Sequence, residues 1–142
     1  MTTTLRIQHE TTPLLVALPA LETMSTAEFI EFCHANRELR IERTATGEVI
    51  VNPPAFSDTG NRNFNISAYL WVWAERDGTG LGFDSSAGFT LPNGAVRSPD
   101  ASWISQSRWD KLSDADKSSL APICPNLDRK STRLNSSHQI IS

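Results

Sequence analysis

The longest helical segment of this sequence most constrains how the chain can fold. It lies within residues 57–80, SDTGNRNFNISAYLWVWAERDGTG, where Asp58 or Thr59 could cap the helix and Gly78 could end it. Its apolar side chains form two stripes at helical spacing, one through Phe64, Ala68 and Trp71 and one through Ile66, Leu70 and Trp73. A helix this apolar should be largely buried, and the neighbouring segments predict a β-sheet as its partner.

Alternating segments on both sides of this helix supply the strands. Residues 39–52 are typical of a hairpin, in which apolar and charged residues alternate and Thr46-Gly47 supplies the turn. Further strands are predicted at 81–84, 88–91 and 95–104. A first helix begins after Ser25, which can form a capping box with Glu28. The order of elements predicts a mixed α/β (α+β) domain whose sheet is mixed or antiparallel.

Length, cysteine content and charge narrow the classes of protein. The 142 residues suit one domain, and no run of about 18 apolar residues predicts a membrane span. The first residues lack a secretory leader pattern. Cys33 and Cys124 are far apart and predict free thiols in a reducing cytoplasm. The net charge of −3 excludes a broad basic surface for nucleic acid, although a magnesium site that cuts phosphodiesters is itself built from carboxylates.

The last fifteen residues, 128–142, differ from the rest of the chain. They read DRKSTRLNSSHQIIS and show no period, turn signal or cap. Reverse-translated, residues 128–138 match a common sequencing-library adapter read through in frame. We therefore expect residues 1–127 to be the N-terminal part of a domain, and residues 128–142 to be a non-native, disordered tail.

This tail completes a misleading pattern. Pro99-Asp100 followed by Asp128-Arg129-Lys130 spells PD…DxK, which is typical of magnesium-dependent nucleases. Because the second half of the pattern comes from the adapter-like segment, we give it no catalytic weight.

The body of the chain nevertheless resembles a known family. Four segments together are similar to the Uma-type restriction-endonuclease-like proteins, abundant in cyanobacteria. They are residues 38–54, 59–80, 83–104, which ends in SPDASWI, and 121–126, which reads APICPN. The resemblance covers roughly residues 25–127. It implies the restriction-endonuclease-like PD-(D/E)xK fold, here incomplete at its C-terminal end.

The resemblance also implies site residues. Asp100 matches the metal-binding aspartate and Glu42 matches an acid near the site, so both are predicted to be catalytic and to bind Mg²⁺. The family places a glutamate in the following strand, near position 130, and Asn126 stands where an aspartate is usual. The second metal carboxylate, and the group that orients water, are therefore expected to be absent from this chain.

Each candidate also has a plainer interpretation. From the local sequence alone, Asp100 is the polar first residue of a strand and Glu42 an outward-facing acid of a hairpin. Arg97 and Arg108 could contact phosphate, although surface arginines are commoner. Trp71, Trp73, Trp103 and Trp109 could stack on bases, but their spacing favours packing in or around a core.

Two functions remain open at this point. The first is a Mg²⁺-dependent endonuclease acting on DNA, of which this chain is a truncated and inactive form, with a homodimer possible. The second is a non-catalytic nuclease-fold module that binds a partner or nucleic acid. In either case the loss of later strands should leave apolar surface uncovered and solubility poor.

Overall fold

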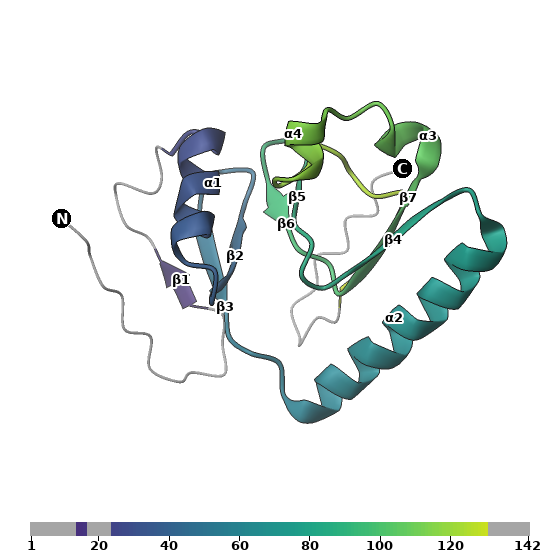
Figure 1. The fold of residues 1–142 in the computed structure, drawn as a ribbon. Coiled ribbons are helices and arrows are strands. Elements are labelled where there is room, and N and C mark those ends of the chain that lie inside the picture. Colours follow the sequence, from purple (N-terminus) through teal and green to yellow (C-terminus); the bar gives the residue numbers. More distant parts are fainter. Residues whose placement is uncertain (1–13, 17–23, 131–142) are drawn as a thin grey trace.

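Two antiparallel sheets form the framework of the chain (Figure 1). The structure, a computed structural model, describes residues 14–16 and 24–130. In chain order the elements are β1 (Leu14–Val16), α1 (Thr26–Ala35), β2 (Arg40–Arg43), β3 (Val49–Asn52), α2 (Ser57–Asp77), β4 (Gly80–Asp84), β5 (Phe89–Thr90), β6 (Val96–Arg97), β7 (Ala101–Ser105), α3 (Gln106–Trp109), α4 (Asp114–Lys117) and β8 (Leu127–Arg129). This mixture of helices and antiparallel sheets confirms the predicted α+β class.

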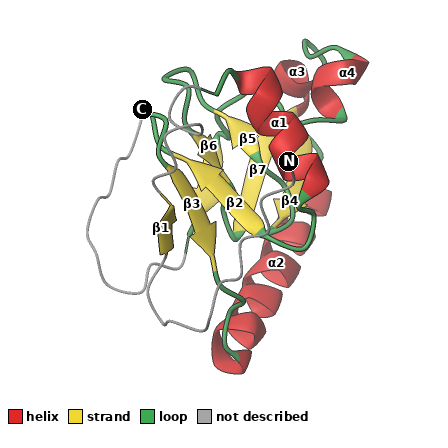
Figure 2. Cartoon of the chain, turned by 90° about the vertical axis from the view of Figure 1, so that its left-hand side faces the viewer, coloured by secondary structure: helices red, strands yellow, loops and turns green. Residues whose placement is uncertain are grey.

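The larger sheet has five strands in the order β1-β3-β2-β6-β5, and α1 lies against it (Figure 2). The β2–β3 hairpin turns at Gly47, whose φ of 93° is one that glycine adopts readily, as the sequence predicted. The predicted capping box between Ser25 and Glu28 also forms at the start of α1. The core of this half is made of buried side chains from α1, β2, β3 and β6: Phe29, Ile41, Val49, Val51 and Val96.

Arg43 ties α1 to this sheet from the same face of β2 as Ile41. Its guanidinium donates to the carbonyl oxygens of Gly94 and Met24 and to the hydroxyl of Thr26, and it lies 4.7 Å from the centroid of the Phe29 ring. Burial raises the pKa of the nearby Cys33 thiol to about 11, an effect that Arg43 partly opposes. Beneath α1, the Arg43 cation is therefore held by several hydrogen bonds, and the Cys33 thiol stays neutral.

The smaller sheet has three strands in the order β4-β7-β8. A second hydrophobic cluster lies between this sheet and β5, and it contains Phe89, Ile104, Ala121 and Ile123. The ring of Phe83 contacts Phe89 edge-on at 5.5 Å and Trp109 at 5.0 Å. This second cluster therefore joins β7 of the smaller sheet to β5 of the larger one.

The expectation that the long helix is largely buried was wrong. Of the residues of α2, only Ala74 is buried, while Phe64 is 73% exposed and Trp71 63% exposed. The helix of 21 residues is about 31 Å long, whereas β4, with five residues, spans only about 17 Å. Its N-terminal half therefore extends past the strands (Figure 1). The Ile66–Leu70 stripe is partly buried, and Trp73 contacts Trp103 edge-on at 5.3 Å.

The ends of α2 agree only in part with the sequence. Gly78 ends the helix in the left-handed conformation, as predicted. The N-cap is Phe56, without a side-chain cap, rather than Asp58 or Thr59. The Asp58 carboxylate instead accepts the backbone N–H of Thr59 and pairs with Arg62 one turn later.

The start of the adapter-like segment also differs from expectation. Residues 128 and 129 are not disordered but belong to β8, where they pair with β7, and residue 130 is described as well. Residues 131–142 of the predicted tail lie outside the described residues. In the part of the chain that the structure describes, no helix has the length and apolar character needed to span a membrane.

Candidate functional site

The candidate site lies where the chain passes from one sheet to the other. β6 belongs to the larger sheet and β7 to the smaller one, and Ser98, Pro99 and Asp100 connect them. The backbone N–H of Asp100 donates to the carbonyl oxygen of Arg129 in β8 at 2.8 Å. This connection places the Asp100 carboxylate beside the larger sheet while its backbone is fixed to the smaller one.

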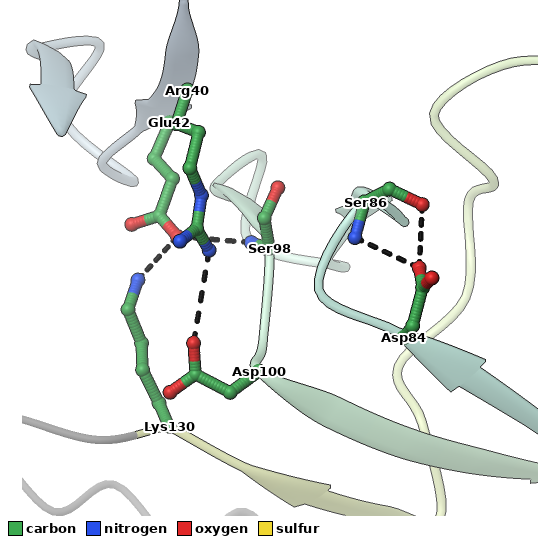
Figure 3. A network of polar contacts seen from close by, with 7 residues as sticks. All are labelled: Arg40, Glu42, Asp84, Ser86, Ser98, Asp100 and Lys130. Atoms are coloured by element: carbon green, nitrogen blue, oxygen red, sulfur yellow. Dashed lines mark hydrogen bonds and ion pairs between the residues drawn. The ribbon is translucent and has the colours of Figure 1, made fainter. Parts of the chain in front are cut away.

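Glu42 is supplied by β2, on the face opposite to α1. Its side chain is buried, and its Oε1 accepts the backbone N–H of Ser98 at 3.0 Å (Figure 3). Arg97 Nη1 lies 3.5 Å from Oε2, and Lys130 Nζ forms an ion pair with Oε1. The carboxylate is therefore held by one backbone donor and two cations.

Asp100, only 5% exposed, is the second acid of the cluster. Arg40 Nη2 lies 3.7 Å from its Oδ1. Arg40 and Glu42 stand two residues apart on β2 and so share one face of that strand. The structure thus brings both predicted site residues, Glu42 and Asp100, into one network (Figure 3).

The register of β7 and β8 explains how Lys130 enters this network. Ala101 pairs with Arg129 and Ser102 with Asp128, and the ladder ends at the first of these pairs. Asp100 and Lys130 therefore adjoin the same end of the ladder, where the backbone N–H of Asp100 bonds to Arg129. From there the Lys130 side chain reaches Glu42.

The network does not fit a divalent cation as it stands. Magnesium prefers hard oxygen ligands from carboxylates, with room for bound water. Here two carboxylates face three cationic side chains: Arg40, Arg97 and Lys130. Within residues 14–16 and 24–130, no group of three or more His, Cys, Asp or Glu side chains could hold a metal.

Asp84 and Ser86, although drawn near the network in Figure 3, form a separate turn. The Asp84 carboxylate accepts the hydroxyl and the backbone N–H of Ser86, and the hydroxyl contributes most to lowering the pKa of Asp84. This carboxylate is thus used to fix the loop after β4.

The remaining candidates have structural partners. Arg108 Nη1 donates to the Asn126 side-chain oxygen at 2.9 Å, and the same oxygen accepts the N–H of Ser105 at 3.0 Å. Trp103 and Trp109 are partly buried, in agreement with the predicted packing role. Trp71 is exposed, which contradicts a packing role for its side chain.

Sequence reasoning missed Arg40 and Lys130. The signal for Arg40 was its position two residues before Glu42 on the same strand. Lys130 was set aside because of the origin predicted for its segment, yet its side chain, like that of Arg97, forms an ion pair with Glu42.

The comparisons with known proteins assign the family. Residues 26–127 match the family model Uma2, described as "Putative restriction endonuclease". No curated protein matches the chain. The family match, the α+β fold and the convergence of Glu42 with Asp100 agree with one another, and the chain belongs to the Uma2 family of restriction-endonuclease-like proteins.

Proposed function

We propose that Glu42 and Asp100 are the acids of a site for cutting DNA phosphodiesters, dependent on Mg²⁺ in its active arrangement. We further propose that this chain binds DNA phosphate at the site without cutting it. The observation that carries the proposal is a pair of buried acids, one from β2 and one from the connection between the two sheets, beneath three cationic side chains that are each about a third exposed. Restriction-endonuclease-like proteins in general use divalent metal ions, which suits the presence of the acids.

The cationic side chains suit a phosphate group. Arg40, Arg97 and Lys130 each have a buried carboxylate beneath the charged group, which limits the rotamers that the side chain can adopt. Their charges outnumber those of the acids by one, so the site should attract an anion. Because both carboxylates are already neutralised, no step of hydrolysis can pass through a metal in this arrangement.

The charge balance predicts how DNA affinity responds to Glu42→Gln. The carboxamide oxygen still accepts the N–H of Ser98, while the net positive charge of the network rises by one. We expect binding of a labelled DNA duplex at low salt to become about three- to tenfold tighter, measured by fluorescence anisotropy. The matched control is Glu48→Gln on the exposed end of the same hairpin, which should change little. Equal effects of the two substitutions, or weaker binding by Glu42→Gln, would contradict a phosphate site here.

The same proteins test cleavage. The unmodified chain should not nick supercoiled plasmid in the presence of Mg²⁺, and Asp100→Ala should be equally inactive. Mg²⁺-dependent nicking that Asp100→Ala abolishes would show that the unmodified chain is an active enzyme.

A second candidate is a nuclease-fold module that binds DNA or another partner and has no catalytic form. The excess of cations over acids favours it, because a dedicated metal site would have the opposite balance. A Lys130→Glu chain that binds a metal but never nicks DNA would support the module over the enzyme.

We also propose that two copies of the chain pair through the uncovered stripe of α2. Phe64, Ala68 and Trp71 lie on one face of the helix, and the small Ala68 between two aromatic rings allows a second helix to approach closely. The double substitution Phe64→Ser and Trp71→Ser should shift the protein to monomer in light scattering after size exclusion. Tyr69→Ser, which changes an equally exposed ring outside this stripe, is the control. A monomer at every concentration in the unmodified protein would overturn the homodimer.

Two smaller assignments complete the proposal. The free thiols of Cys33 and Cys124 support a reducing cytoplasm as the location of the protein. The adapter-like sequence after Leu127 supports a chain cut short and extended by residues from another source.

A further inference from the structure

We infer that the ammonium group of Lys130 takes the place of a divalent cation at Glu42 and Asp100 and keeps such an ion out. The inference deepens the proposed function, on which it rests for the role of the two acids, by naming the residue that controls the site. Its prediction is direct: the chain as sequenced binds neither Mg²⁺ nor Mn²⁺ here, and the side chain at position 130 decides this.

The first argument is geometric. Lys130 Nζ is paired with Glu42 Oε1, although the two residues are 88 positions apart in the chain. The β7–β8 ladder ends at the Ala101–Arg129 pair, so Asp100 and Lys130 adjoin the same end of it. A positive charge at position 130 therefore lies on Glu42, close to the end of the ladder that carries Asp100.

The second argument is electrostatic. A divalent ion entering the present network would meet two carboxylates and three fixed cations within a few ångströms. Glu42 is almost fully buried, so these charges are screened less by water and salt than surface charges would be. An acid at position 130 would reverse the balance to three carboxylates against two arginines and supply the hard oxygen ligands that Mg²⁺ and Mn²⁺ require.

A plain surface salt bridge is the alternative explanation of the Lys130 contact. The lysine side chain is 37% exposed, and such pairs contribute little to stability. Thermal stability therefore does not separate the two explanations, whereas metal binding does. A structural salt bridge would leave metal affinity unchanged when Lys130 is replaced.

The experiment measures Mn²⁺ binding by electron paramagnetic resonance, with titration calorimetry for Mg²⁺. The proteins are the unmodified chain, Lys130→Glu, Lys130→Gln and the double variant Lys130→Glu with Asp100→Asn. Lys111→Glu makes the same charge change at an exposed position away from the network. Circular dichroism checks that each variant is folded.

We expect no saturable Mn²⁺ binding by the unmodified chain or by Lys111→Glu. Lys130→Glu should bind one Mn²⁺ per chain, and Asp100→Asn should weaken that binding at least about tenfold. Lys130→Gln, which removes the ammonium without adding a carboxylate, should bind measurably but more weakly than Lys130→Glu. If Lys130→Glu does not fold, Mn²⁺ binding by Lys130→Gln still tests the inference.

Two results would overturn the inference: Mn²⁺ binding by the unmodified chain that Asp100→Asn abolishes, or no gain of binding in any folded Lys130 variant. Failure of the proposed function looks different. In that case Lys130→Glu binds the metal as expected, but no variant cuts DNA and Glu42→Gln does not alter DNA affinity.

Discussion

Replacing Arg43 with methionine is expected to lower the free energy of unfolding by about 3 kcal/mol. The substitution removes the guanidinium donors to the carbonyl oxygens of Gly94 and Met24, and it ends the contact of the cation with the Phe29 ring. An unsatisfied buried acceptor costs about 1–3 kcal/mol, which is an upper bound for these partly buried carbonyl oxygens, and methionine restores only part of the packing. Urea unfolding followed by circular dichroism measures the loss.

Two companion substitutions sharpen this test. Arg37→Met removes an exposed arginine at the end of the α1 region and should change stability by less than about 0.5 kcal/mol. Arg43→Lys keeps the charge but cannot reach several acceptors with one planar group, so it should be nearly as destabilising as methionine. If Arg43→Met is no more costly than Arg37→Met, the guanidinium does not anchor α1.

A methyl group at Gly80 is expected to cost about 3 kcal/mol as well, for a steric reason. A Cβ atom there would lie 2.3 Å from the carbonyl oxygen of Ile104 and 2.5 Å from Cζ2 of the Trp103 ring. Both contacts are far inside van der Waals separation, and the first is to backbone of the neighbouring strand, which cannot move without breaking the ladder. Gly80→Ala should therefore shift β4 away from β7 and lower the urea midpoint.

Gly82→Ala is the matched control in the same strand. The nearest atoms to a Cβ at Gly82 are 3.9 Å and 4.0 Å away, which is ordinary contact distance. Since both positions lie in one strand, their intrinsic strand preferences cancel in the comparison. Equal midpoints for the two variants would contradict the close approach of Trp103 to Gly80.

The sequence predicted local structure well because local structure depends on neighbouring residues. The capping box at Ser25, the turn at Gly47 and the end of α2 at Gly78 all follow from side-chain or backbone chemistry within a few positions. The burial of α2 could not be predicted in this way. It depends on the length of strands elsewhere in the chain, and these are shorter than the helix.

The residues of the candidate site were likewise predicted only in part. Glu42 and Asp100 were identified through a resemblance, and the structure brings them together. The cations around them depend on pairings between distant segments, above all the β7–β8 ladder, whose end brings Lys130 to Glu42. A pattern in the sequence gives no register, so Lys130, one of the two cations paired with Glu42, was set aside on other grounds.

The connection between the two sheets at residues 98–100 affects the order in which the nascent chain can fold. The hydrogen bond from Ser98 to Glu42 closes a separation of 56 residues, and the pair between Lys130 and Glu42 closes one of 88. Glu42 and the β2–β3 hairpin emerge from the ribosome first, while the segment carrying Lys130 emerges last among the residues that the structure describes. Until then Arg40 and Arg97 are the cations that pair with Asp100 and Glu42, so the Lys130 contact is the last part of the charge network that the nascent chain can complete.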